Sequence, residues 1–296
     1  MNQAEGQKSW GWMVVLYIFL AGLGGGTFVL SFALNLLGKY QAVSQIGCLI
    51  GPLLVALGTF LLIFDLGSPQ RSYRLFTTAS TFGSSWMIRG AWILLAFIIF
   101  GLLYALPSFS WFSWLPWNQT TLTGIILGWI AGLLAVFVTV YPGLLLGVIR
   151  SIPLWNTAAL PPLFFLSGLD TGLAALVLLS LAFPASIGAD AFHMLGAIDI
   201  ILIVLVLIVL GTYVEILRQS GVAATAAVQL LKGPLFITGV VIAGLVIPLC
   251  ILIVSNFVQD VTFIRILDGT AGILILFGGL LLRFKIVKSG VRIVVS

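Results

Sequence analysis

Charged residues are scarce in this sequence, and their scarcity excludes a water-soluble fold. Only 7% of the 296 residues are charged and 61% are hydrophobic, whereas roughly a quarter of the residues in a soluble domain are charged. A hydrocarbon layer about 30 Å thick needs roughly 20 apolar residues per crossing helix, so the sequence could hold about eight crossings. The net charge of +5 is therefore interpreted as a topology signal, and no nucleic-acid partner is predicted.

Histidine and cysteine are nearly absent, which excludes two kinds of redox centre within the chain. His193 is the one histidine, whereas a haem with two axial imidazoles needs two and a transmembrane di-haem cytochrome needs four. Cys48 and Cys250 cannot supply the four thiolates of an iron–sulfur cluster. We therefore predict no haem and no metal ligands, and assign any iron–sulfur cluster to a partner. His193 is interpreted as an interfacial residue at a helix start.

The sequence also lacks the period-two alternation of barrel strands, so we expect helices. The first apolar run is too long for a signal peptide and is expected to be a span. The predicted fold is all-α and integral to the membrane, a single polytopic domain over 1–296 with one four-helix bundle in 1–150 and a second in 151–296. Its eight spans are placed at 11–37, 46–64, 86–106, 121–146, 159–183, 194–216, 234–256 and 267–284.

Basic residues are divided unevenly between the two sides of this predicted domain. An even number of spans puts both ends of the chain on one side, and the other side receives Lys39 and Arg265. The imbalance favours cytoplasmic termini. The basic residues assigned to the side of the termini are Lys8, Arg71, Arg74, Arg89, Arg150, Arg218, Lys232, Arg283, Lys285, Lys288 and Arg292.

Ionisable side chains inside membrane helices are costly, so each is a functional candidate. Asp170 lies about ten residues into the fifth predicted span, roughly 15 Å deep, which suggests a proton route; the alternative is a neutral acid bonded to a neighbouring helix. Asp65 closes the second span, Arg89 opens the third and Arg150 follows the fourth. An ion pair of Asp65 with Arg71 or Arg89 is a structural alternative. Three further acids lie nearer to predicted helix ends and are expected to reach water: Asp199, Glu215 and Asp268.

Two segments combine small, aromatic or proline residues. The glycines of AGLGGG, residues 21–26, are expected to let neighbouring helices approach closely, and the tryptophans of loop 107–120 suggest an interfacial aromatic belt. In the segment 141–170, Pro142 interrupts the fourth span beside Tyr141, and such breaks are tolerated where they line a cavity. The Tyr141 hydroxyl could donate a hydrogen bond to a quinone carbonyl, or Tyr141 could be an ordinary interfacial tyrosine.

Several of these strings together resemble the NrfD-like family, the membrane subunits of polysulfide-reductase-type complexes. The strings are SWGWMVVLYIFLAGLGGG, FDLGSPQR, SSWMIRGAW and YPGLLLGVIRSIPLWN with LPPLFFLSGLDTG, in order over about the first 175 residues. The last four spans are similar in pattern and length. The resemblance implies a haem-free subunit of the prokaryotic cytoplasmic membrane that binds menaquinone or ubiquinone. It also implies an iron–sulfur partner subunit carrying cubane clusters, connected to a catalytic, often molybdopterin, subunit.

The resemblance further implies a quinone pocket among the first four helices, near the side where the first helix starts. Tyr141 matches the family's fourth-helix tyrosine. Some members carry a histidine near the start of the first helix, where this chain has Trp10, Gly11 and Trp12. Well-studied relatives place the redox partner outside the membrane on the pocket side, whereas the basic residues here favour a cytoplasmic location for that side.

The resulting hypothesis is a quinone-reactive anchor that exchanges electrons between an iron–sulfur subunit and the membrane quinone, with associated proton transfer. The predicted catalytic residues are Tyr141, Asp65, Arg89 and Asp170. The predicted quinone-binding residues are Tyr141, Arg150, Asn156, Trp10 and Trp12. The alternatives are a proton-coupled secondary transporter, which an inverted repeat would favour, and a purely structural anchor.

Overall fold

The structure is a computed structural model that describes residues 11–65, 86–182, 188–220, 228, 231 and 233–290. Eight helices in these ranges are long and apolar enough to cross a membrane, which confirms the prediction of an all-α membrane protein. The helices are α1 (Trp12–Leu36), α2 (Gln41–Asp65), α4 (Trp86–Ala105), α5 (Leu122–Gly147), α6 (Leu160–Leu181), α7 (Ala189–Gln219), the π-helix η5 (Phe236–Val246) continued by α9 (Ile247–Ser255), and α10 (Val261–Lys288).

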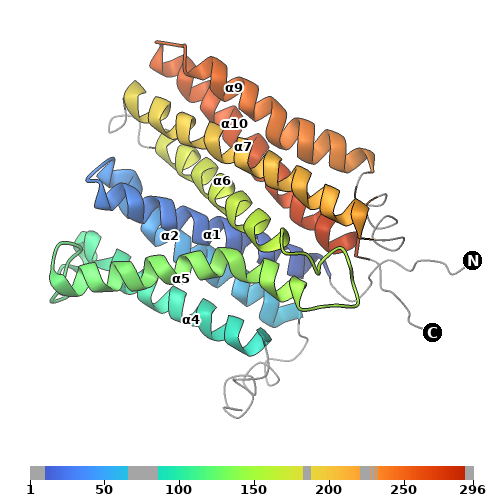
Figure 1. The fold of residues 1–296 in the computed structure, drawn as a ribbon. Coiled ribbons are helices and arrows are strands. Elements are labelled where there is room, and N and C mark those ends of the chain that lie inside the picture. The colour runs from blue at the N-terminus through green and yellow to red at the C-terminus, as the bar shows by residue number, and fades with distance from the viewer. Residues whose placement is uncertain are drawn as a thin grey trace, which may run out of the picture.

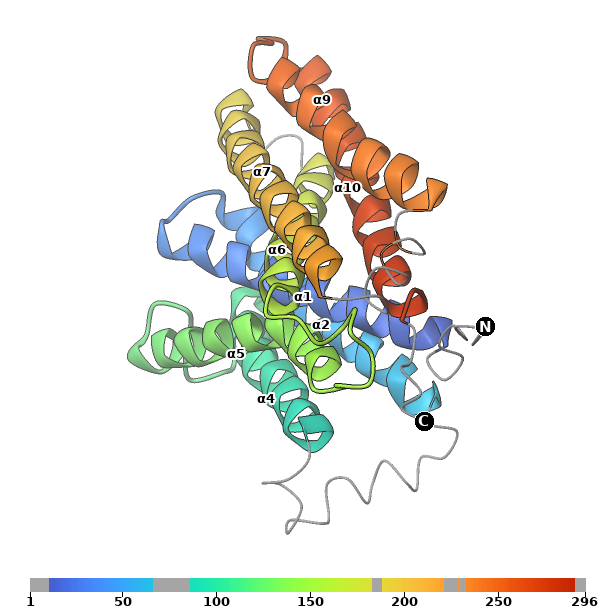
Figure 2. The ribbon, with the colours of Figure 1, turned by 45° about the vertical axis from the view of Figure 1, so that its right-hand side comes forward.

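Two groups of helices lie side by side. Figure 1 shows α1, α2, α4 and α5, in blue and green, below α6, α7, α9 and α10, in yellow to red. Within the first group α1 contacts α2 and α5, and α4 contacts the same two helices; in the second group α10 contacts all the others. Helix α1 also contacts α6 and α10, so it joins the groups, as the rotated view in Figure 2 shows. The division near residue 150 stays a prediction.

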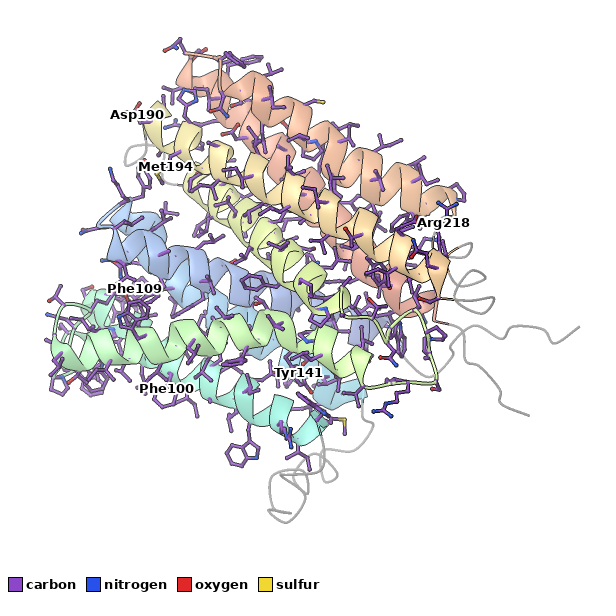
Figure 3. All side chains as sticks on the ribbon, in the orientation of Figure 1. Phe100, Phe109, Tyr141, Asp190, Met194 and Arg218 are labelled. Atoms are coloured by element: carbon purple, nitrogen blue, oxygen red, sulfur yellow. The ribbon has the colours of Figure 1, made fainter. Side chains whose placement is uncertain are left out.

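The helices run alternately up and down, which gives the molecule two ends. Figure 3 shows Tyr141 and Arg218 toward one end and Phe109 and Asp190 at the other. We name these ends the Tyr141 face and the Asp190 face. Helices α1 and α6 begin at the Tyr141 face, and α7 and α10 begin at the Asp190 face.

Glycines on α1 bring this helix into direct backbone contact with its neighbours. A Cβ atom built on Gly24 would lie 2.5 Å from the carbonyl oxygen of Gly51 on α2, and one on Gly26 would overlap the carbonyl of Gly168 on α6. Gly25 faces α5, where a Cβ would lie 2.7 Å from the methyl group of Thr139. Helices in lipid associate through such close packing. The structure therefore confirms the predicted role of these glycines, which is to let neighbouring helices approach closely.

The seventh span differs from expectation, because its first half is a π-helix instead of an α-helix. Residues 236–246 form the π-helical stretch, and the α-helix that follows contains Pro248 in its first turn. Gly244 lies against α10 at Gly278, where a Cβ on either residue would collide with the other backbone. The wider π-turns thus occur where η5 and α10 are in backbone contact, and the sequence periodicity did not predict them.

The loop between α4 and α5 is built on local hydrogen bonds. The side-chain oxygen of Asn118 accepts from the backbone amides of Thr120 (2.9 Å) and Thr121 (3.0 Å), and Thr121 caps α5 by accepting from the Gly124 amide at 3.3 Å. The side chains of Trp111 and Trp114 are largely exposed. This exposure suits the predicted aromatic belt, because tryptophan side chains favour the membrane–water interface.

We predict that Gly26→Ala destabilises the protein, because the added Cβ would overlap the backbone of α6. Overpacking of this kind costs roughly 1–3 kcal/mol. The matched control is Gly211→Ala on α7, where a Cβ meets nothing within 4 Å. Thermal unfolding in mild detergent should show a lower midpoint for Gly26→Ala alone. Equal midpoints for the two variants would contradict backbone contact between α1 and α6.

Candidate functional site

Tyr141 lies buried near the end of α5 and connects it to the start of α4. Its hydroxyl donates a hydrogen bond to the backbone carbonyl of Trp86 at 3.2 Å. Its ring packs directly on Gly90, where a Cβ atom would overlap the phenol. Pro142 follows it inside the helix and has no N–H, so the carbonyl one turn earlier loses its usual donor. The sequence thus places a phenol at a weakened helix turn near the Tyr141 face.

Arg89 is the charged group nearest to Tyr141 along α4. It is half-buried, and its guanidinium carbon lies 5.1 Å from the centre of the Trp86 ring. A cation over an indole face is favourable by roughly 0.5–1 kcal/mol at an exposed site. Because Trp86 also accepts the Tyr141 hydrogen bond through its backbone, the first turn of α4 holds both predicted site residues together.

Tyr17 on α1 is a neighbour of Tyr141 that sequence reasoning missed. It is buried, its hydroxyl has no hydrogen-bond partner among the described residues, and it lies close enough to Tyr141 for a charge on one phenol to act on the other. A buried hydroxyl without a partner is rare, because its desolvation is uncompensated. The sequence feature that could have identified Tyr17 is a phenol within an otherwise apolar run, five positions before Gly22 of the glycine segment.

The remaining residues predicted to bind quinone, and Asp65, are exposed or have side chains outside the described part of the chain. Arg150 and Asn156 are exposed in the connection between α5 and α6, and Trp12 is 59% exposed at the start of α1. Trp10 lies outside the described residues, and Asp65 ends α2 with a side chain outside them. The predicted ion pair of Asp65 with Arg71 or Arg89 therefore also involves atoms outside the described part.

The proline-rich connection is anchored to the second group of helices. The indole nitrogen of Trp155 donates to the carbonyl of Ile286 on α10 at 2.9 Å, and the hydroxyl of Tyr213 on α7 donates to the carbonyl of Leu154 at 2.7 Å. Leu154 and Trp155 are fully buried. These contacts fix the backbone next to Arg150 and Asn156.

Three aspartates are buried in the second group, and two of them contradict expectation. Asp170 is 2% exposed, as its predicted depth implies. Asp199 and Asp268, expected to reach water at helix ends, are 2% and 1% exposed. Asp170 and Asp199 share a side-chain hydrogen bond, and Asp268 interacts with Asp199 electrostatically. Glu215 is exposed as expected and lies 3.6 Å from Arg218.

Arg283, counted among the basic residues at one side of the membrane, is instead 1% exposed inside the bundle. One of its terminal nitrogens donates to the Ser167 hydroxyl at 3.1 Å and to the Gly279 carbonyl at 2.9 Å. The guanidinium lies against the rings of Phe19 and Phe164. It also interacts electrostatically with Asp170. Arg283 thus supplies the positive charge next to the buried acids.

The described residues hold no cluster of three or more histidine, cysteine, aspartate or glutamate side chains suited to a metal ion. A cavity of about 400 Å³ opens at the Asp190 face, and amides and Tyr104 line it. Its polar wall is organised by Asn35, whose amide donates to the Tyr104 hydroxyl and to Gln119, both at 2.7 Å. None of the predicted site residues lines this cavity, so we do not assign the quinone to it.

Nearly the whole chain is similar to one protein family. The family profile described as "Polysulphide reductase, NrfD" matches residues 1–295. The protein is 26% identical to the C chain of polysulfide reductase from Wolinella succinogenes, over 95% of this chain and 94% of that protein. It is 27% identical to a protein NrfD homolog of Haemophilus influenzae, also over 95% and 94%. Protein NrfD of Escherichia coli is 27% identical over 58% of this chain and 59% of its own length. The chain therefore belongs to the family described as polysulphide reductase, NrfD.

Proposed function

We propose that this chain is the haem-free, quinone-reactive membrane subunit of an oxidoreductase complex. The family membership and the eight membrane-spanning helices support a membrane anchor. The relative from Wolinella succinogenes is named as the C chain of its reductase, and that letter supports a subunit of a larger assembly. The observation that carries the quinone proposal is the buried Tyr141 hydroxyl beside a second buried phenol, Tyr17.

Tyr141 would orient the quinone head group. A phenol has one donor and two acceptor lone pairs, and that donor now bonds to the Trp86 carbonyl. Rotation about the C–O bond of the phenol would direct the proton to a quinone carbonyl. The Trp86 carbonyl at the first turn of α4 would then accept a hydrogen bond from water instead. The Tyr17 hydroxyl, which has no partner among the described residues, would then share the polar contacts of the head group.

The remaining predicted residues would surround the proposed quinone site at the Tyr141 face. Arg89 would stabilise negative charge that develops on a reduced quinone, and Asp65 would exchange its proton with water. Arg150 and Asn156, on the anchored connection, would form the outer rim with Trp10 and Trp12. Exposed residues at this rim are also available to a partner.

An iron–sulfur subunit would dock at the Tyr141 face and pass electrons between its clusters and the quinone. Through it this protein would connect to a catalytic subunit, such as a molybdopterin enzyme, at the prokaryotic cytoplasmic membrane. The buried acids would also suit a proton-coupled transporter. Purification in mild detergent separates the two functions, because a multi-cluster iron–sulfur protein should co-purify with an anchor and not with an autonomous transporter.

Tyr141→Phe should impair quinone turnover while the complex still assembles, because it removes one hydroxyl and little volume. Loss of one hydrogen bond costs about 1 kcal/mol, or roughly fivefold in kcat/KM. The matched control is Tyr104→Phe, which removes another buried hydroxyl at the Asp190 face and should leave turnover unchanged. Steady-state assays with a short-chain quinol measure both variants. Wild-type kinetics for Tyr141→Phe would remove this tyrosine from the site.

Asp170→Asn tests the predicted proton role, because it preserves size and hydrogen bonding but removes the group that can gain and lose a proton. We expect proton uptake and quinone turnover to fall on the order of a hundredfold, since a positioned proton-transfer group typically contributes that much or more. The control is Glu215→Gln, which alters an exposed surface pair. Both variants are assayed in liposomes after assembly is verified. Wild-type rates in Asp170→Asn would make this aspartate structural.

Orientation is testable with two exposed residues at opposite faces. The imbalance of basic residues puts the Tyr141 face in the cytoplasm, although Arg283 no longer counts toward it because it is buried. In intact cells a membrane-impermeant maleimide should therefore label Lys39→Cys and spare Arg218→Cys, both in a Cys250→Ser background. Labelling of Arg218→Cys from outside would instead agree with the arrangement implied by the family resemblance.

A further inference from the structure

Buried polar atoms without hydrogen-bond partners are concentrated along one line through the molecule. Such atoms are uncommon in proteins, and internal water usually satisfies them. Most of those found among the described residues belong to the second group of helices and the part of α1 that faces it. They include the hydroxyl of Tyr17, Nε and Nη2 of Arg283, Oδ1 of Asp170, Asp199 and Asp268, and Nδ1 of His193.

The line starts where α1, α6 and α10 meet. Arg283 reaches Ser167 on α6, and Asp170 lies one helical turn further along the same face of α6. A Cβ atom on Gly22 of α1 would lie 2.5 Å from Nη2 of Arg283, so only a glycine leaves this side of the guanidinium open. Tyr17, the neighbour of Tyr141, precedes Gly22 by five positions, or about 7.5 Å of helix.

The line continues through α7 to α10. Asp170 is hydrogen-bonded to Asp199, and His193, Gly196 and Asp199 follow one another at intervals of three on one face of α7. A Cβ atom on Gly196 would lie 3.9 Å from Oδ2 of Asp268 and 3.5 Å from the side-chain nitrogen of Asn256. Gly196 therefore lies next to Asp268 and Asn256, with a methyl group of Leu252 at 3.8 Å from the same position.

Depth along the helices shows that the line crosses much of the membrane. Asp170 lies ten residues from the start of α6 at the Tyr141 face, or roughly 15 Å. Asp268 and His193 lie seven and four residues from the starts of α10 and α7 at the Asp190 face, or roughly 10 Å and 6 Å. The polar groups are therefore spaced from the middle of the bilayer to the face opposite Tyr141.

We propose that these groups form a hydrated proton route between the quinone site and the Asp190 face. This proposal rests on the proposed function and extends it to Asp199, Asp268, His193 and Arg283. Water would bridge the unpartnered atoms, and Arg283 would hold one carboxylate in its charged form. A hydrogen bond between two carboxyl groups requires that one of them carries a proton, so the pair Asp170 and Asp199 holds a proton that it can transfer.

The route gives quinone chemistry a direction across the membrane. Reduction of one quinone to quinol takes two electrons from the partner subunit and two protons, one for each carbonyl oxygen. If the electrons arrive at the Tyr141 face and the protons arrive through Asp268, Asp199 and Asp170, charge moves across the bilayer. Quinol oxidation would release the same two protons along the same route toward the Asp190 face.

The test uses the purified complex in liposomes, with reduced benzyl viologen as electron donor and a short-chain naphthoquinone as acceptor. Two viologens supply the two electrons for each quinone. The orientation of the complex in the liposomes is determined by labelling Lys39→Cys with an impermeant maleimide. Impermeant pH dyes report the pH of each compartment separately. The variants are Asp199→Asn, Asp268→Asn and the conservative Asp268→Glu, with Glu215→Gln as the surface control.

We expect the wild type and Glu215→Gln to consume protons from the compartment at the Asp190 face. Proton uptake there should fall about tenfold or more in Asp199→Asn and Asp268→Asn and recover in Asp268→Glu. Uptake within about twofold of the wild type in both asparagine variants would overturn the route while leaving the quinone function intact. Proton uptake from the Tyr141 face in the wild type would overturn it equally. Absence of viologen-dependent quinone reduction in the wild type would overturn the proposed function, and the route with it.

An infrared measurement tests the shared proton independently of turnover. A protonated buried carboxyl has a carbonyl stretch distinct from that of a carboxylate, and the stretch shifts in deuterated water if the site is hydrated. The wild type should show an exchangeable band that weakens in Asp199→Asn and persists in Glu215→Gln. A band that does not exchange, or that is unchanged in Asp199→Asn, would contradict a hydrated route through this pair.

Discussion

Backbone contact at the glycines of α1 is the constraint on which the rest of the structure depends. Lipid removes most of the hydrophobic drive for helix association, so close packing must hold the helices together. Gly24, Gly25 and Gly26 face α2, α5 and α6, three helices drawn from both groups. Any side chain larger than hydrogen at Gly26 would separate α1 from α6, and that separation would also move Asp170 on α6 away from α1.

The same close packing determines where charge can be buried. Arg283 occupies a space that exists because Gly22 has no side chain, and its contacts with Ser167 and the Gly279 carbonyl satisfy only one of its nitrogens. A buried cation is tolerated when a nearby anion compensates it, and Asp170 interacts with it. The guanidinium and Asp170 therefore stabilise each other, although their helices are far apart in sequence.

The eight spans were predictable because hydropathy alone encodes them. The helix ends were not predictable, and the errors in their positions explain why the burial of several charged residues was predicted wrongly. The predicted boundaries put Asp199 five residues and Asp268 one residue inside their spans. Helix α7 begins instead at Ala189 and α10 at Val261, so both aspartates lie deeper and are buried. Arg283 was likewise placed at a span end, but α10 continues to Lys288. Tyr141 could be predicted as a site residue because Pro142 interrupts the helix next to it. Tyr17 could not, because it lies in an uninterrupted apolar run.

Helix α1 belongs to both groups, and this double membership connects the two chemical parts of the molecule. On one side Tyr17 lies near Tyr141, at the site proposed for quinone. About a turn and a half further along, Gly22 contacts Arg283, where the buried acids begin. Because the helix is rigid and is held by backbone contacts on several sides, the distance between the two phenols and the guanidinium is fixed. A change of charge at the quinone site would therefore act on Arg283 and Asp170 through a short, constant separation, in a medium that screens charge weakly.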